Sequence, residues 1–176
     1  DIAKVMKETT DSVVYAQNEV NGLVPFTPIM RAYIKDNGTV SSDFVHTCVF
    51  VVDCDENIAR KAIDALISHH DILRGTLSED GIEIHPFDKR IAYSFEAICI
   101  ADAYEAKEYL KTIRLREDKL INVVFCSTVE GNLISITVHH FLIDLLSWEI
   151  VIKDFNTAIK QLKNNEQVSL PAKTAA

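Results

Sequence analysis

The 176-residue sequence predicts an α+β layered sandwich in which helices cover a largely antiparallel sheet. Three features favour this class. Runs rich in β-branched and aromatic residues are interspersed with stretches whose apolar residues recur at helical spacing. Two of the strand-like runs are separated by the four residues Val129-Glu130-Gly131-Asn132, a length typical of an antiparallel hairpin. The strict strand–helix alternation of a doubly wound parallel sheet is missing.

The N-terminal half predicts two helices, a buried strand and a hairpin. Thr27 followed by Pro28 matches an N-cap and a proline at the first helical position, so a short helix should run from there to about Lys35. In the hairpin, the turn Glu79-Asp80-Gly81 is expected to supply the positive φ. The other expected elements are a helix end and linker over residues 1–21, a strand over 44–52, a helix whose apolar stripe covers 59–73 and the hairpin itself over 75–85.

The C-terminal half predicts three more strands, two helices and a tail. The strands are expected over 92–100, 120–128 and 133–140, and the helices over 103–113 and 148–162. From residue 168 the chain should leave the body in extended form.

Composition excludes several classes of protein. The formal net charge of −8 and the absence of any basic run argue against a nucleic-acid binder. No apolar stretch approaches the roughly 20 residues that span a bilayer, and no signal-peptide pattern opens the chain. The cysteines lack metal-site spacing, so we interpret them as small buried hydrophobic residues in a reducing cytoplasm. They are Cys48, Cys54, Cys99 and Cys126. The first residue is Asp1 rather than Met, which suggests a piece of something longer.

The most informative stretch runs from His139 to Trp148. Two histidines end an alternating apolar run, and the carboxylate of Asp144 follows, so a group that titrates near neutral pH lies at a strand end. Alternation places His139 and His140 on opposite faces of the sheet, and the period does not say which one serves a cavity. Adjacent ligands on opposite faces cannot converge on one ion, so no metal site is expected here.

Structural roles are also open to the residues that follow the histidines. Either Asp144 or Ser147 could cap the long helix. Trp148 lies on the apolar stripe of that helix, where a core role is expected.

Four stretches together resemble a known family. His139-His140-x-x-x-Asp144 followed by Ser147-Trp148 resembles the HHxxxDGxSW motif of epimerization domains, in the condensation-domain superfamily of nonribosomal peptide synthetases. The three other stretches occur in the family's order. Residues 24–29 (VPFTPI) are similar to its P-L-[ST]-P-I-Q opening, residues 69–74 (HHDILR) to its H-H-D-x-L-R motif, and residues 170–174 (LPAKT) to its L-P-x-K-T segment. The resemblance covers about residues 23–176, and it departs from the family at Leu145, where the motif has glycine, and at Met30.

The resemblance implies a chloramphenicol-acetyltransferase-like fold of two lobes, of which residues 23–176 would be the N-terminal lobe. Residues 1–22 would be a linker, with the tail of an upstream carrier-protein domain. His140 would be the acid/base residue, and His139, Asp144, Ser147 and Trp148 would support it. Arg74 would form a structural ion pair with Asp144, as a buried carboxylate requires. Leu145 would strain the turn, if glycine is needed there for φ, or narrow the substrate channel.

The implied activity is epimerization of an L-aminoacyl or peptidyl thioester to the D form. The substrate would be carried on the phosphopantetheine arm of a peptidyl carrier protein, with no cofactor of the domain's own. The C-terminal lobe would be the second partner, so the isolated lobe should be inactive. Two alternatives stay open, namely amide-bond-forming condensation and a degenerate lobe that only docks a carrier protein. The expected location is the cytoplasm.

Overall fold

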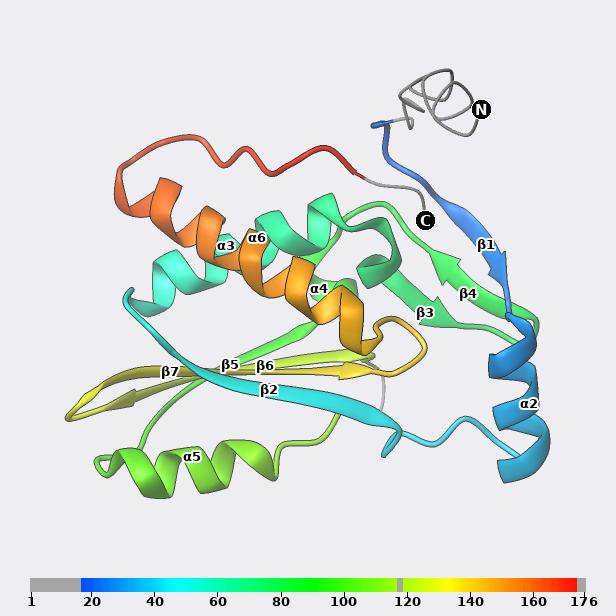
Figure 1. Ribbon diagram of the computed structural model, residues 1–176, viewed down its shortest axis with the longest axis horizontal. Helices are drawn as coiled ribbons and strands as arrows, with labels where there is room; N and C mark the ends of the chain where they lie inside the picture. The colour runs from blue at the N-terminus through cyan, green and yellow to red at the C-terminus, as the bar shows by residue number, and fades with distance from the viewer. Residues whose placement is uncertain (1–16, 117–118, 174–176) are drawn as a thin grey trace, which may run out of the picture.

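The computed structural model describes residues 17–116 and 119–173 of the chain. The helix end expected near the N-terminus lies outside the described residues. The described part is an α+β structure in which helices lie on both faces of a four-stranded sheet (Figure 1). This is the predicted layered class.

The four-stranded sheet has the order β2-β7-β6-β5. Its strands are β2 (Val45–Val52), β7 (Gly131–His139), β6 (Ile121–Thr128) and β5 (Ser94–Cys99). Two of the three pairings are antiparallel, including the predicted hairpin of β6 and β7. The pair β5–β6 is parallel, because the chain crosses between them through helix α5 (Ala103–Lys111). The largely antiparallel sheet is therefore confirmed, with one strand–helix–strand unit that the pattern did not reveal.

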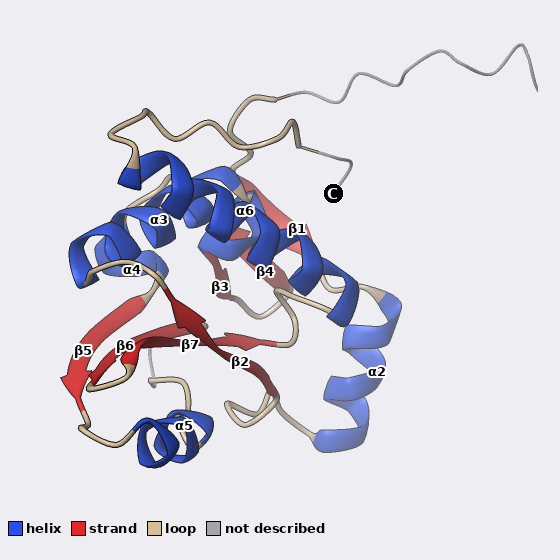
Figure 2. Cartoon of the chain, turned by 60° about the vertical axis from the view of Figure 1, so that its left-hand side comes forward, coloured by secondary structure: helices blue, strands red, loops and turns tan. Residues whose placement is uncertain are grey.

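Helices cover the two faces of this sheet unequally. Helix α3 (Glu56–His69) and helix α6 (Leu145–Lys163) pack together on one face, and α5 covers the other (Figure 2). The buried residues of β6 and β7 therefore face apolar side chains on both sides, which explains why both strands are nearly continuous apolar runs. The larger core cluster lies between the sheet and the α3–α6 pair.

A second, three-stranded antiparallel sheet has the order β1-β4-β3. It comprises β1 (Gly22–Pro25), β4 (Gly81–Ile84) and β3 (Gly75–Leu77). The predicted hairpin is thus present, but the prediction that Gly81 supplies a positive φ is wrong, because the described glycines with positive φ are Gly22, Gly38 and Gly131. A Cβ atom on Gly81 would lie 2.1 Å from the carbonyl oxygen of Val24. Gly81 is needed because strand β1 approaches its backbone closely.

Helix α2 (Pro28–Asn37) begins where the sequence predicts a cap. Thr27 is the N-cap of this helix, and Gly38 ends it in the left-handed conformation with φ of 73°. Two short elements, the 3₁₀ helix η1 (Asp71–Arg74) and helix α4 (Lys89–Ala92), precede β3 and β5 respectively.

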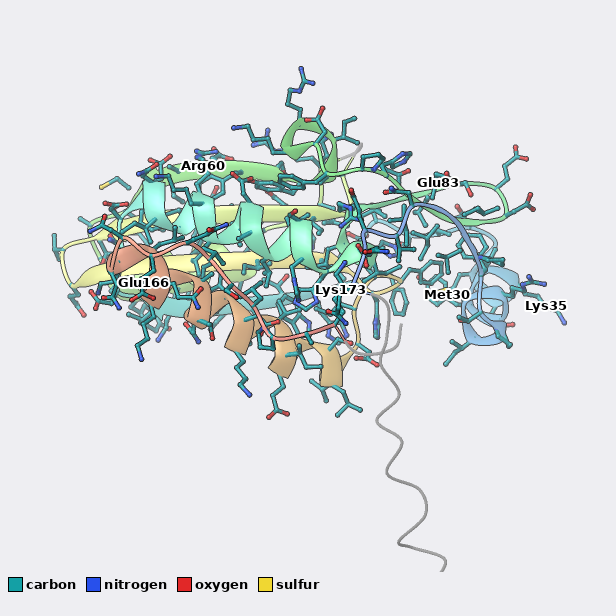
Figure 3. All side chains as sticks on the ribbon, turned by 90° about the horizontal axis from the view of Figure 1, so that it is seen from above. Met30, Lys35, Arg60, Glu83, Glu166 and Lys173 are labelled. Carbon is teal, nitrogen blue, oxygen red and sulfur yellow. The ribbon has the colours of Figure 1, made fainter. Side chains whose placement is uncertain are left out.

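The C-terminal tail is extended, as predicted, but it does not leave the body. The side-chain amide of Gln161 donates to the carbonyl of Ser169 and accepts from its N–H, which holds the tail on α6. Further along, the Lys173 N–H donates to Gln17, so the tail meets the segment that leads into β1 (Figure 3).

Candidate functional site

His140 lies immediately after β7, where its backbone N–H donates to the carbonyl of Phe44. Its ring Nδ1 is 2.8 Å from the carbonyl oxygen of Ile143. A carbonyl can only accept, so Nδ1 carries the proton and the lone pair of a neutral imidazole is on Nε2. The rings of His46 and Phe44 lie 4.1 and 4.6 Å from the His140 ring, centroid to centroid. His140 is therefore oriented as a base. Nδ1 is held by the Ile143 carbonyl, and Nε2 is the nitrogen that could accept a proton.

His139 has both ring nitrogens occupied. Nδ1 accepts from the Phe141 N–H at 3.1 Å, so Nε2 carries the proton and donates to the carbonyl of Ser41 at 3.2 Å. The side chain is 1% exposed, and this burial lowers its pKa. His139 shares its face of the sheet with Ser135, which contacts α5. His140 instead lies beside His46, its diagonal neighbour on the adjacent strand β2. The two rings thus lie on opposite faces, as alternation predicts, and His139 has no free nitrogen for chemistry.

The stability of the fold should depend on pH through His139. Its folded pKa lies below the unfolded value of about 6.5. The unfolded chain therefore binds more protons as the pH falls below that value, and the free energy of unfolding decreases. Urea unfolding between pH 7.5 and pH 5 should show this decrease, with a smaller slope in His139→Gln. The pKa values of His46 and His70 are also lowered, mainly by burial, so part of the slope should persist.

A His85→Gln variant is the matched control, because His85 lies at the end of β4 and bonds to Thr76 outside this site. The part of the slope that comes from His139 should persist in this variant, because the His139 ring and its two backbone bonds are unchanged. An unchanged slope in His139→Gln would contradict the assignment of a neutral, buried imidazole.

Asp144 is the N-cap of α6. Its exposed carboxylate accepts from the Ser147 N–H at 2.7 Å, and hydrogen bonds from Ser147 lower its pKa. Of the two candidate caps, the structure thus selects Asp144, and Ser147 supplies the donor. Because this carboxylate is exposed and already bonded to the helix backbone, it needs no buried arginine.

The predicted ion pair of Arg74 with Asp144 is therefore wrong. Arg74 is 1% exposed and donates to Asp71 at 2.8 Å, three residues away in η1. Its other N–H groups donate to three backbone carbonyls, those of Ser68, His85 and Val20. A residue and a partner three positions apart in one helical turn meet locally. The carboxylate of Glu19 also lies 3.5 Å from the Arg74 guanidinium.

Asp71 joins two of the family-like stretches. Lys173 donates to both of its carboxylate oxygens, at 3.0 and 2.9 Å, in addition to the bond from Arg74. Burial opposes ionisation of Asp71, but the hydrogen bonds from Lys173 and Arg74 outweigh it and lower the pKa. The segments over residues 69–74 and 170–173 therefore meet in one partly buried network, which fixes this part of the C-terminal tail beside β1.

Trp148 and Leu145, the two remaining residues of the histidine motif, lie in the core and at the surface respectively. Trp148 is buried in the core, and its Nε1 has no hydrogen-bond partner. Leu145 begins α6 and is 76% exposed. Among the described residues the non-glycine residue with positive φ is Asn165, so Leu145 does not strain the backbone. The expectation that Leu145 strains the turn, in place of the motif glycine, is therefore wrong.

His46 was missed by the sequence analysis. It belongs to β2, and the register that pairs it with Val138 brings it beside His140. Burial lowers its pKa, the charge of His140 lowers it further, and Asp144 acts in the opposite direction. The alternation of β2 gives the face on which His46 lies only relative to its own strand. The pairing of β2 with β7, which is distant in the sequence, is what brings the His46 and His140 rings together.

The contact between these rings predicts a change in the titration of His46. In a His140→Gln variant the pKa of His46 should rise, but not to its ordinary value, because burial is the larger cause and persists. Heteronuclear NMR of the imidazole resonances measures this directly. An identical titration curve for His46 in the variant and in the original chain would contradict the contact.

The cysteines are free thiols and lie apart from this chemistry. Burial raises the pKa of Cys48 and Cys126, and raises that of Cys54 to about 11, so these thiols are protonated at neutral pH. Cys126 is buried as predicted and Cys48 and Cys54 are partly so, but Cys99 is exposed at the end of an edge strand, which corrects the expectation for that residue. No helix within the described ranges is long and apolar enough to cross a membrane.

Comparison with known proteins agrees with this geometry. The family model for the condensation domain matches residues 21–175. Bacitracin synthase 2 of Bacillus licheniformis is 27% identical over 168 residues, which cover 88% of this chain and 6% of the relative. Tyrocidine synthase 1 of Brevibacillus parabrevis is 25% identical over 186 residues, covering 98% of this chain and 17% of the relative. The chain thus spans a small part of each.

Solved structures show the same fold. The epimerization domain from the third module of tyrocidine synthetase B superposes with a TM-score of 0.78 and 25% identity, covering 92% of this chain and 40% of that chain. The first condensation domain of the CDA synthetase gives a TM-score of 0.65 at 15% identity, covering 86% and 42%. With its layered α+β architecture and a histidine oriented as a base at the end of β7, the chain belongs to the condensation domain family of nonribosomal peptide synthetases.

Proposed function

We propose that residues 23–176 form the N-terminal lobe of an epimerization domain. The parent synthetase would convert an L-aminoacyl or peptidyl group, held as a thioester on the phosphopantetheine arm of a carrier protein, to the D form. The observation that carries this proposal is the arrangement of His140, whose Nδ1–H is held by the Ile143 carbonyl while Nε2 has a free lone pair. Residues 1–22 would link this lobe to an upstream carrier domain.

The chemistry is a proton transfer at the α-carbon. Nε2 of His140 removes the α-proton, so the C–H bond breaks and an N–H bond forms. The electron pair is delocalised into the thioester carbonyl, and a proton is then returned to the opposite face of the same carbon. That second transfer needs an acid on the other side of the substrate, which in the family is a glutamate of the second lobe. His46 contacts the same His140 ring from within this lobe, so it is not positioned as the opposing acid.

The surface beside His140 supports a two-lobe arrangement. Leu145 and Leu146 are both more than three-quarters exposed at the start of α6, and Ile150 follows one turn later. Neighbouring exposed apolar side chains of this size indicate an interaction surface. We assign it to the C-terminal lobe, so the 176-residue chain alone should not epimerize a carrier-bound substrate. The free thiols suit the reducing cytoplasm expected of such a synthetase.

Two other functions are compatible with the family. Condensation would use His140 to position an amine for attack on an upstream thioester, and a degenerate lobe would only dock the carrier protein. The Ser147-Trp148 pair and the likeness to a solved epimerization domain at 25% identity support epimerization. Leu145 in place of the motif glycine is the feature that supports a degenerate lobe.

One assay separates the three functions. A carrier protein is loaded with an L-aminoacyl group, the full-length parent synthetase is added, and the product is analysed for chirality and for new amide bonds. A mixture of L and D aminoacyl thioester is expected for epimerization. A new amide with unchanged chirality would indicate condensation, and neither product would indicate docking alone; both outcomes would overturn the proposal.

A further inference from the structure

A second pair of histidines lies outside the His140 site. His69 is the last residue of α3, and His70 follows as its C-cap with φ −89° and ψ 97°. Because the chain turns between them, both side chains can point towards one place, unlike adjacent residues of a strand. That place is Asp154 in the middle of α6, whose Oδ2 is 2.9 Å from Nε2 of His70. The rings of the two histidines are perpendicular, with centroids 5.0 Å apart.

The carboxylate of Asp154 is only partly compensated in this arrangement. It is 3% exposed, and a buried carboxylate requires a cation or several donors. Among the described residues, the polar partner of Asp154 is the His70 ring. Lys173 is itself paired with Asp71.

We propose that His69, His70 and Asp154 bind one divalent transition cation of the zinc type. One ligand atom from each residue lies within 4.8 Å of the others. Zn–N and Zn–O bonds of about 2.0–2.2 Å place tetrahedral ligands roughly 3.3–3.5 Å apart. The His70–Asp154 pair therefore needs to open by a few tenths of an ångström, and His69 needs to close the larger gap.

His69 is free to make this movement, and an ion can reach it. The residue is partly exposed and lines an open groove of about 560 Å³, together with Phe87 and Lys173. Neutral imidazole and carboxylate are the ligand forms that zinc requires, and the fourth position would take water from the groove. The bound ion would join α3 to α6, the two helices that cover one face of the sheet.

Titration of the metal-free chain with ZnCl₂ in a calorimeter tests the proposal. We expect saturable binding of one ion per chain and a higher Tm in the presence of Zn²⁺. Co²⁺ should give the intense visible bands of a tetrahedral site. Replacing His69 removes a ligand but leaves the buried His70–Asp154 pair, so the His69→Ala variant should fold. Loss of a direct ligand should cost at least as much as loss of an outer-shell partner, about 10–100-fold in affinity.

The matched control is His85→Ala, which removes a histidine bonded to Thr76 outside the cluster. It should bind Zn²⁺ as the original chain does, and so should a Cys99→Ser variant, which removes the exposed thiol. Equal affinity in His69→Ala and the original chain would overturn the site, as would no saturable binding in either, and the His70–Asp154 contact would then be a hydrogen bond alone. Neither result bears on the epimerization proposal, which rests on His140.

Discussion

Replacing Arg74 with alanine is expected to lower the free energy of unfolding by about 3–5 kcal/mol, the usual cost of removing one partner from a buried ion pair. The guanidinium is almost completely buried and bonds to the carboxylate of Asp71 and to the carbonyls of Ser68, His85 and Val20. Those carbonyls belong to three separate segments of the chain. The variant would leave them without this donor and would leave Lys173 as the main side-chain partner of Asp71.

Urea unfolding monitored by circular dichroism measures this loss. Arg116→Ala is the control, because Arg116 forms an exposed ion pair with Glu96 at 2.8 Å, and such pairs contribute no more than about 1 kcal/mol. Arg74→Lys should also be destabilised, since an ammonium group cannot reproduce the planar fork that reaches four acceptors. A change below about 1 kcal/mol in Arg74→Ala, comparable to an exposed pair, would contradict the structural role of this residue.

Replacing His140 with alanine is expected to slow epimerization by the parent synthetase about 10²–10⁴-fold, the usual contribution of a positioned acid/base residue. The fold should persist, because among the described residues the side-chain hydrogen bond of His140 is to the nearby Ile143 carbonyl. Product chirality on the loaded carrier measures the rate. Circular dichroism of the variant lobe checks the fold.

His139→Ala is the matched comparison for this variant. It removes a fully buried ring whose two nitrogens bond to the backbone, so it should mainly lower stability. If His140→Ala unfolds the lobe while His139→Ala slows the reaction without affecting the fold, the two roles are assigned the wrong way round.

The sequence predicted the elements that depend on local chemistry. Thr27 and Pro28 begin α2 as expected, and the apolar alternation of β6 and β7 predicted their hairpin. The alternation of side chains along β7 also predicted that His139 and His140 lie on opposite faces of the sheet. These features follow from contacts between residues near one another in the chain, which periodicity and capping rules describe.

Features that depend on tertiary pairing could not be predicted in this way. The parallel pairing of β5 with β6, the approach of β1 to Gly81 and the contact of His46 with His140 each require knowing which segments meet. The prediction of an Arg74–Asp144 ion pair was wrong for a related reason. Resemblance suggested a distant partner, whereas the actual carboxylate, Asp71, lies within the same motif.

The central claim is that Nε2 of His140 transfers the α-proton of a carrier-bound thioester. Loss of deuterium from a carrier loaded with an α-deuterated L-aminoacyl group tests it most directly, with the parent synthetase and its His140→Ala variant compared in ordinary water. We predict that the original protein exchanges deuterium for hydrogen while D product accumulates, and that the variant retains the label. Exchange by the His140→Ala variant at the rate of the original protein would contradict the claim.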